Sequence, residues 1–242
     1  AENFGEIEPD VILADFPEKH YEMADFFQGI YNKYFRLYKM TKEDTVKTEQ
    51  YKANSARLEK SKVMSINDYL LSLNTVIKID KADTFNIPRI AQLTQKTNQF
   101  NLTTKRYNEA DIRQLIEDKY RIFTLEVSDK FGNQGISGLI ILREIKANQS
   151  VSIDSLLLSC RILGKKIEFE FVKYILFKMK NLGYTKVFAK YIESDRNEQV
   201  KDFYEELGFT CQKVKNKEKL EKEYCYSLLN TDIELSRNYK LD

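Results

Sequence analysis

The pattern of hydrophobic and polar positions changes near Leu73. From residue 75 onward, short β-branched and aromatic runs alternate with segments of helical periodicity. The pattern predicts strands over residues 75–80, 121–129, 136–145, 151–159, 186–192, 210–215 and 223–228. It predicts helices over residues 85–95, 108–120, 165–182 and 197–207, the last two ended by Gly183 and Gly208. This order indicates an α/β fold with a mixed sheet flanked by helices rather than a doubly wound parallel sheet.

The first part of the chain, residues 1–73, has a mostly helical pattern. Aromatic residues recur at helical spacing from Tyr21 to Tyr38. Such a stripe favours a face buried against a neighbouring domain over a surface on which a ligand stacks. Thr41 begins a capping-box pattern ahead of a polar helix that extends to about Lys62. We therefore expect two parts, a helical segment over residues 1–73 and an α/β domain over residues 74–242.

Composition and charge exclude several classes of protein. Of the 242 residues, 42% are hydrophobic, which is enough to build a core. The 39 basic and 37 acidic residues leave a net charge of only +2, which argues against a nucleic-acid partner. No apolar run approaches the ~18 residues of a membrane span, and no secretory leader is visible. We expect a cytoplasmic protein with no membrane partner; a first residue other than Met is typical of a processed or partial chain.

Cysteine and histidine narrow the chemistry further. Cys160, Cys211 and Cys225 lack C-x-x-C spacing, which is typical of free thiols in a reducing compartment. His20 is the only histidine, and its position favours a packing or surface residue. A catalytic imidazole pair is therefore excluded, and we expect no metal cofactor in this chain.

A turn between a buried strand and a long helix is the first candidate binding site. The strand ends near Ser159, Gly164 lies in the turn, and the helix follows. Free N–H groups and the positive end of the dipole at a helix start bind phosphate. Arg161, Lys165 and Lys166 add positive charge. The alternative is an ordinary strand-to-helix turn with solvated lysines.

Two motifs in this region resemble those of the GNAT acyltransferase superfamily. Arg161-x-x-Gly164-x-Lys166 matches the family's pyrophosphate-binding pattern, R/Q-x-x-G-x-G/A, except at Lys166. There a side chain replaces a residue that lets the backbone approach phosphate. The run from Asn197 through Tyr204 to Phe209 matches the family's late helix.

This resemblance implies a cofactor and roles for particular residues. The cofactor would be CoA or carrier-bound phosphopantetheine. Its binding residues would be Arg161, Gly164, Lys165, Lys166 and Asn197, with Asn197 facing the pantetheine arm. Tyr204 would protonate the departing thiolate.

A longer signature is similar to the FkbH-like family over about residues 10–230. It consists of P-R-I-A-Q-L-x-Q-K-T-N-Q-F-N-L-T-T-x-R-Y from Pro88 to Tyr107 and S-C-R-I-L-G from Ser159 to Gly164. These proteins join an N-terminal HAD-type phosphatase-like domain to a C-terminal GNAT-like domain. Members with an assigned role load a glyceryl unit as a thioester on an acyl carrier protein for polyketide or related pathways.

For this chain the FkbH-like resemblance implies two partners, an acyl carrier protein and an HAD-type domain that precedes it. Residues 1–73 would be the tail of that HAD-type domain. The HAD motif D-x-D-x-[TV] is absent from the sequence. We therefore expect no phosphatase activity from this chain.

Cys160 and a polar run are the candidates for the transfer chemistry. Cys160 lies at the strand end, where a thiol can accept an acyl group as a thioester and pass it on. The alternative is a small buried apolar residue. Residues 96–104 are either a surface loop or a site that hydrogen-bonds a polyhydroxylated acyl group without charging it. The substrate-binding residues would be Asn98, Gln99, Asn101, Thr103 and Thr104.

The sequence thus predicts an acyltransferase that moves a glyceryl or other acyl group to the phosphopantetheine thiol of an acyl carrier protein. Two alternatives stay open. One is a CoA-dependent N-acyltransferase that acts on an amine. The other is a non-catalytic module that docks the carrier protein for the HAD-type domain.

Overall fold

The computed structural model describes residues 16–17, 19–32, 72–216, 218–236 and 240–241. The chain divides into two units, residues 1–49 and residues 50–242, which are considered separately. Leu73 is fully buried, and its carbonyl accepts a hydrogen bond from the Lys130 amide at 3.1 Å, so it packs within the second unit. The expectations for residues 1–15 and 33–71, including the helix after Thr41, lie outside the described residues. The boundary after residue 73 stays a prediction.

The described part of the first unit is a short aromatic helix. The 3₁₀ turn η1, His20–Glu22, continues into α2, Met23–Ile30. The ring of Phe16 lies 5.1 Å from that of Phe26 and 5.9 Å from that of Phe27, between centroids. His20 is exposed. That this aromatic face packs against another domain stays a prediction.

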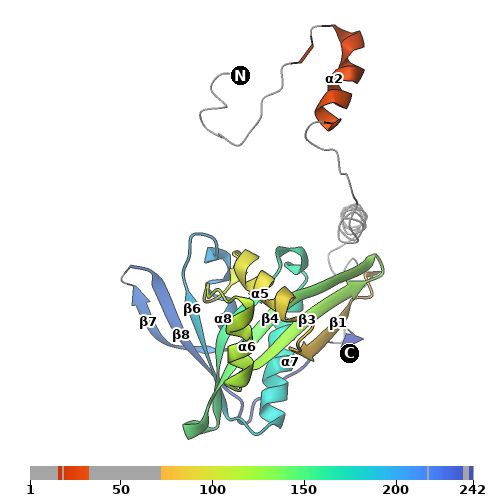
Figure 1. Cartoon of the computed structure of the whole chain (residues 1–242). Helices are drawn as coiled ribbons and strands as arrows, with labels where there is room; N and C mark the ends of the chain where they lie inside the picture. The colour runs from red at the N-terminus through yellow and green to blue at the C-terminus, as the bar shows by residue number, and fades with distance from the viewer. Residues whose placement is uncertain (1–15, 18, 33–71, 217, 237–239, 242) are drawn as a thin grey trace. The chain divides into compact units, whose positions relative to one another are not determined.

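The second unit is built on a mixed sheet, shown in Figure 1. Its described strands run in the order β7-β8-β6-β5-β4-β3-β1-β9, and β2 joins beside β5. The strands are β1 Val76–Lys81, β2 Phe100–Asn101, β3 Arg121–Asp129, β4 Gly132–Ile145, β5 Ser150–Leu158, β6 Lys186–Ile192, β7 Thr210–Asn216, β8 Leu220–Ser227 and β9 Lys240–Leu241. The pairs β5/β6 and β1/β9 are parallel, and the other described pairs are antiparallel. The predicted fold class, a mixed α/β sheet flanked by helices, is confirmed.

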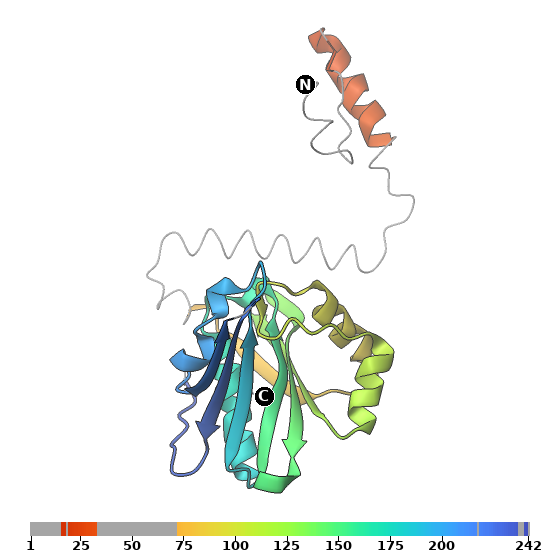
Figure 2. The same ribbon diagram turned by 90° about the vertical axis from the view of Figure 1, so that its left-hand side faces the viewer.

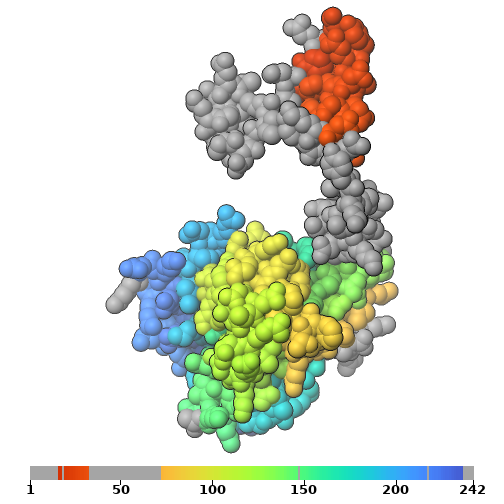
Figure 3. Space-filling view, in the orientation of Figure 1, coloured from red at the N-terminus to blue at the C-terminus, as the bar shows by residue number. Residues whose placement is uncertain are grey.

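Helices cover both faces of the sheet, as Figure 2 shows. Figure 3 shows one of these faces, covered by the yellow to green helices of residues 87–117. The α-helices are α5 Ile87–Lys96, α6 Glu109–Glu117, α7 Ile167–Asn181 and α8 Phe203–Glu206, and the 3₁₀ turns are η3 Lys146–Asn148, η4 Cys160–Ile162 and η5 Glu198–Val200. Leu139 and Ile141 of β4 pack with α5 and α6. Ile140 and Leu142 pack with α7 and α8 on the opposite face. Burial on both faces explains why β4 contains an uninterrupted hydrophobic run.

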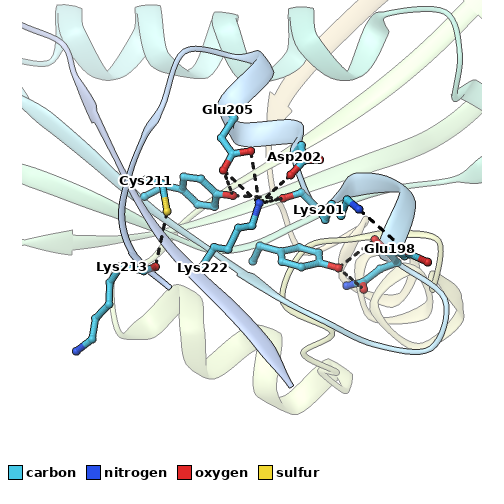
Figure 4. Close-up of polar contacts among 10 residues, drawn as sticks. Glu198, Lys201, Asp202, Glu205, Cys211, Lys213 and Lys222 are labelled. Carbon is cyan, nitrogen blue, oxygen red and sulfur yellow. Dashed lines mark hydrogen bonds and ion pairs between the residues drawn. The ribbon is translucent and has the colours of Figure 1, made fainter. Parts of the chain in front are cut away.

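The helix expected over residues 197–207 is divided into η5 and α8. The Lys201 carbonyl accepts hydrogen bonds from the Tyr224 hydroxyl at 3.2 Å and from Lys222 Nζ at 3.4 Å. Lys222 also contacts Asp202 Oδ1 at 2.7 Å, as Figure 4 shows. These contacts with β8 take the carbonyl that a continuous α-helix would use for its own backbone bond.

The most important departure from the expected fold lies between β5 and β6. These parallel strands pair only over residues 150–152 and 186–188 and then separate. Beyond that point, β2 pairs with the end of β5, and the Leu102 amide donates to the Leu156 carbonyl at 3.1 Å. The Leu102 carbonyl accepts from the Ile192 amide of β6 at 2.8 Å. The segment for which a surface loop and a substrate-binding site were the two alternatives therefore lies partly between the separated strands, with Phe100 and Leu102 buried in the core.

Candidate functional site

The predicted phosphate-binding turn is present, with a shorter helix after it than expected. α7 begins at Ile167, two residues later than predicted. Gly164 has φ 76° and Lys166 has φ 59°, both in the left-handed region. The last position of the family pattern thus has a backbone that favours glycine, and this chain places a lysine there.

A carboxylate that sequence reasoning missed lies at the start of α7. Glu168 is only 8% exposed, and burial raises the pKa of its carboxyl group. Two effects oppose this shift, a hydrogen bond from its own backbone amide and, more weakly, the charge of Lys166. Its Oε2 atom is buried without a hydrogen-bond partner among the described residues. Acidic residues favour the first turn of a helix because of its dipole, which was the available signal.

Glu168 places a carboxyl group beside the turn that was expected to bind phosphate. It lines a cavity of about 190 Å³ beside the turn, together with Gly164, Phe100 and Phe203. Lys166 lies close enough to lower the pKa of Glu168 electrostatically. Binding of a pyrophosphate by Gly164, Lys165 and Lys166 therefore stays a prediction.

Asn197 lies where the resemblance expects a pantetheine arm, and its amide is used within the chain. Its side chain is fully buried. Nδ2 donates to the Asn101 carbonyl at 2.8 Å and to the Ile192 carbonyl at 2.9 Å. Oδ1 accepts from the Ser194 amide at 2.8 Å and the Tyr191 hydroxyl at 3.1 Å. Through these two carbonyls, Asn197 connects the segment after α5 to the end of β6.

Tyr204 is buried in an aromatic cluster rather than on a cavity wall. It is 1% exposed, and its ring centroid lies 5.1 Å from that of Phe209 and 5.3 Å from that of Tyr224. Its hydroxyl has no hydrogen-bond partner among the described residues. Burial raises the pKa of the Tyr204 hydroxyl far above its usual range. This placement leaves the predicted proton donor without a visible path to a substrate.

We expect Tyr204→Phe to raise the free energy of unfolding by about 1 kcal/mol, because it removes a buried hydroxyl without a partner. Tyr224→Phe is the matched control and should have the opposite sign, since the Tyr224 hydroxyl donates to Glu205 Oε1 at 3.1 Å. Urea unfolding of the two variants measures both effects. An acyl-transfer rate that falls by about 10²–10⁴ in Tyr204→Phe would restore its role as a proton donor.

A larger cavity, of about 540 Å³, lies on the other side of Phe100. It is formed by α5, the segment that follows α5, the end of β5, η4 and the loop after β6. Its lining residues are Arg89, Gln92, Leu93, Lys96, Thr97, Asn98, Gln99, Phe100, Leu158, Ser159, Cys160, Arg161 and Arg196. Cys160, the predicted catalytic thiol, and Arg161, a predicted cofactor-binding residue, thus line the same cavity.

Cys160 is an exposed free thiol at the start of η4. The alternative for this residue, a small buried apolar side chain, is therefore wrong. Next to it, Arg161 Nε donates to Ser159 Oγ at 3.3 Å. The thiol is accessible from the cavity to a substrate or a second thiol.

The five predicted substrate-binding residues have different positions. Asn98 and Gln99 line the larger cavity. Asn101 and Thr103 are buried, and their side chains bond to the chain itself: Asn101 Nδ2 donates to the Thr97 carbonyl at 3.3 Å, and Thr103 Oγ1 donates to the Asp154 carbonyl at 3.1 Å. Thr104 has φ 54°, and its amide donates to Asn101 Oδ1. In this conformation the first two are accessible to a ligand, and Asn101 and Thr103 hold the segment in place.

Positive charge dominates the wall of the larger cavity. Arg89, Lys96, Arg161 and Arg196 all line it. Within the described part of the chain, no acidic residue is among its lining residues. Arg89 lies in the Pro88–Tyr107 signature, whereas no motif marked Arg196. The sequence did not predict a site role for Arg89 or Arg196, because they are far apart in the chain and line one cavity only in the folded structure.

The described residues contain no group of three or more His, Cys, Asp or Glu side chains arranged to hold a metal ion. Within the same residues, none of the helices combines the length and the hydrophobicity that a membrane span requires. The expectations about metal and membrane partners stay predictions.

Comparison with known proteins places the fold. No family model matches the chain, and no curated protein matches it in sequence. In structure it is similar to the ribosomal-protein-S18-alanine N-acetyltransferase from Escherichia coli, with a TM-score of 0.51, 10% identity, and coverage of 66% of this chain and 99% of that one. It is also similar to spermidine N-acetyltransferase from Vibrio cholerae, with a TM-score of 0.50, 18% identity, and coverage of 64% and 96%.

A third structure carries the family name. It is a protein from Desulfovibrio desulfuricans described as an acetyltransferase of the GNAT family, with a TM-score of 0.51, 10% identity, and coverage of 63% of this chain and 99% of that one. At these identities the similarity concerns the fold. The mixed sheet and the helices that flank it match the GNAT fold of these structures.

Proposed function

We propose that this protein is an acyltransferase that passes a glyceryl or other acyl group to the phosphopantetheine thiol of an acyl carrier protein. The observation that carries the proposal is the exposed thiol of Cys160 on the wall of the cavity of about 540 Å³. A thiol exchanges acyl groups with other thiols at little cost in bond energy, so it suits a relay. Asn98 and Gln99 supply uncharged hydrogen-bonding groups on the same wall.

The transfer would take place in two balanced steps. In the first, the Cys160 sulfur loses its proton to solvent and attacks the carbonyl carbon of an acyl thioester. A new C–S bond forms, the donor C–S bond breaks, and the donor leaves as a thiolate that takes up a proton. In the second step, the carrier thiol attacks the Cys160 thioester and the cysteine thiol is regenerated. Holding both sulfurs at one carbonyl is the main contribution of the cavity.

Resemblance to the FkbH-like family supports the partners of this reaction. We infer an HAD-type domain that precedes this chain and an acyl carrier protein that receives the acyl group, both in the cytoplasm. Phosphopantetheine then enters as the arm of the carrier, and its thiol is the acceptor. The exposed position of Cys160 is compatible with delivery of such an arm from outside.

Each alternative function has one observation in its favour. The N-acyltransferase alternative is supported by the fold, since two of the similar structures are N-acetyltransferases. Positive charge in the larger cavity opposes it for polyamine acceptors, because like charges repel. The docking alternative is supported by Asn197, whose amide binds the chain itself where a pantetheine arm was expected.

A single assay separates the three functions. The protein is incubated with an acyl donor, either an acyl thioester of N-acetylcysteamine or acetyl-CoA, and with an acceptor, either spermidine or a carrier protein that bears phosphopantetheine. Products are identified by mass spectrometry. The proposal predicts acyl-carrier formation that depends on the enzyme and no acylated amine. Acetyl-CoA turnover with spermidine and no acylated carrier would favour the N-acyltransferase. Carrier binding with no acylated product would favour the docking module.

A further inference from the structure

The larger cavity is lined by more positive charge than the proposed acyl transfer between two thiols requires. Three arginines and one lysine line it, and within the described part of the chain no acidic side chain does. Lys96 and Arg196 form no ion pair or side-chain hydrogen bond with any described residue. Elsewhere in this unit cations pair with carboxylates, as Lys222 does with Asp202 at 2.7 Å. Lys96 and Arg196 therefore leave positive charge in the cavity that is not neutralised by a described side chain, and such charge attracts an anion.

Arg89 is held in position from the protein side. Its Nε and Nη2 donate to the Ile136 carbonyl of β4 at 3.2 and 3.0 Å, and Nη1 donates to Gln92 Oε1 at 2.5 Å. These are neutral partners, and no described carboxylate pairs with Arg89. Burial and, to a smaller extent, the charge of Arg161 lower the pKa of Arg89, and both residues line the same cavity. A fixed guanidinium is well suited to bind a carboxylate or a phosphate.

The position of Cys160 limits which anion this is. Cys160 and these cations line the same cavity, so an anion bound there shares the cavity with the sulfur. In a phosphopantetheine arm, two amide units and their methylene groups separate the thiol from the phosphate. An extended arm that brings its thiol to Cys160 therefore leaves its own phosphate outside the cavity. The anion belongs to the acyl group instead.

We propose that this cavity is an anion-binding site that selects acyl groups carrying a carboxylate or a phosphate close to the reacting carbonyl. The inference rests on the proposed acyl transfer for its substrate class. Arg89 and Arg196 are the specificity-determining side chains, Arg161 contributes charge next to the thiol, and Lys96 adds to the field. A neutral acyl group of the same length would enter the cavity without these contacts.

The test compares three donors that differ in the terminal group. Succinyl, 3-phosphonopropanoyl and butyryl thioesters of N-acetylcysteamine are given to the protein, and acylation of the peptide that contains Cys160 is followed by mass spectrometry. We expect a charged donor to react about 10- to 100-fold faster than butyryl, because charge-assisted hydrogen bonds hold it. The faster of the two charged donors identifies the anion as a carboxylate or a phosphate.

Variants assign that preference to particular residues. Arg89→Met should reduce the ratio of the charged to the neutral rate towards one. Arg196→Met should lower the same ratio without affecting folding, because Arg196 is exposed and its side chain forms no ion pair or hydrogen bond with the described residues. Arg113→Met is the matched control, because Arg113 lies on α6, outside the cavity, and pairs with Glu109. It should leave the ratio unchanged.

Binding of inorganic phosphate and of succinate, measured by calorimetry, distinguishes the two proposals. Binding that Arg89→Met weakens, without acylation of Cys160 by any donor, would support the anion site and refute the relay. Equal rates for all three donors, without binding of either anion, would overturn the anion site and leave the relay in place.

Discussion

Cys160→Ala is expected to lower the rate of acyl transfer to the carrier by about 10³-fold or more, since it removes the nucleophile of a covalent relay. The wild-type protein, given an acyl thioester but no carrier, should accumulate one acyl mass on the peptide that contains Cys160. Addition of the carrier should discharge that mass. Peptide mass spectrometry with and without carrier measures both steps.

The other two cysteines provide the control for this experiment. Cys211 and Cys225 lie half-buried on β7 and β8, away from the larger cavity. Cys211→Ala and Cys225→Ala should therefore keep transfer near the wild-type rate. A Cys160→Ala protein that loads the carrier at the normal rate would refute the relay and leave direct transfer between donor and carrier.

Asn197→Ala is expected to lower the free energy of unfolding by about 2–4 kcal/mol. The substitution removes four hydrogen bonds of a fully buried amide and leaves the carbonyls of Asn101 and Ile192 with lost partners. Because Asn101 lies in β2, the segment between β5 and β6 should also loosen. Urea denaturation measures the first effect, and faster hydrogen exchange at the Leu102 and Ile192 amides measures the second.

Asn181→Ala is the matched control for Asn197→Ala, because Asn181 is an exposed residue at the end of α7. It should change the free energy of unfolding by no more than about 0.5 kcal/mol. If Asn197→Ala keeps its stability and instead loses affinity for CoA, the residue binds the cofactor as the resemblance implied. In that case β2 must leave its place between the strands when CoA binds.

The elements of the second unit were largely predictable because their signals are local. The strands over residues 121–129 and 186–192 coincide with β3 and β6, since alternation and β-branched residues indicate them directly. Gly183 and Gly208 end α7 and α8 in the left-handed conformation, as expected. Two motifs separated by more than thirty residues were enough to indicate the GNAT fold that the structural comparison shows.

The division of the late helix and the strand β2 escaped prediction because partners distant in the chain determine them. A carbonyl used by Tyr224 and Lys222 divides the helix expected over residues 197–207. β2 is too short for a periodic signal and forms only because β5 and β6 separate beside it. The helix and strand propensities of a short segment do not predict hydrogen bonds with residues that are distant in the sequence.

The sequence by itself determined the fold class and showed that a thiol at the end of a strand is followed by positively charged residues. These features depend on local periodicity and on residues that are neighbours in the chain. Only the tertiary structure decided that Asn197 turns inward and that the Tyr204 hydroxyl is buried. It also decided that Arg89, from α5, and Arg196, from the loop after β6, line the same cavity as the Cys160 thiol. Spatial convergence of residues about a hundred positions apart depends on how strands pair and helices pack, and local patterning does not encode it.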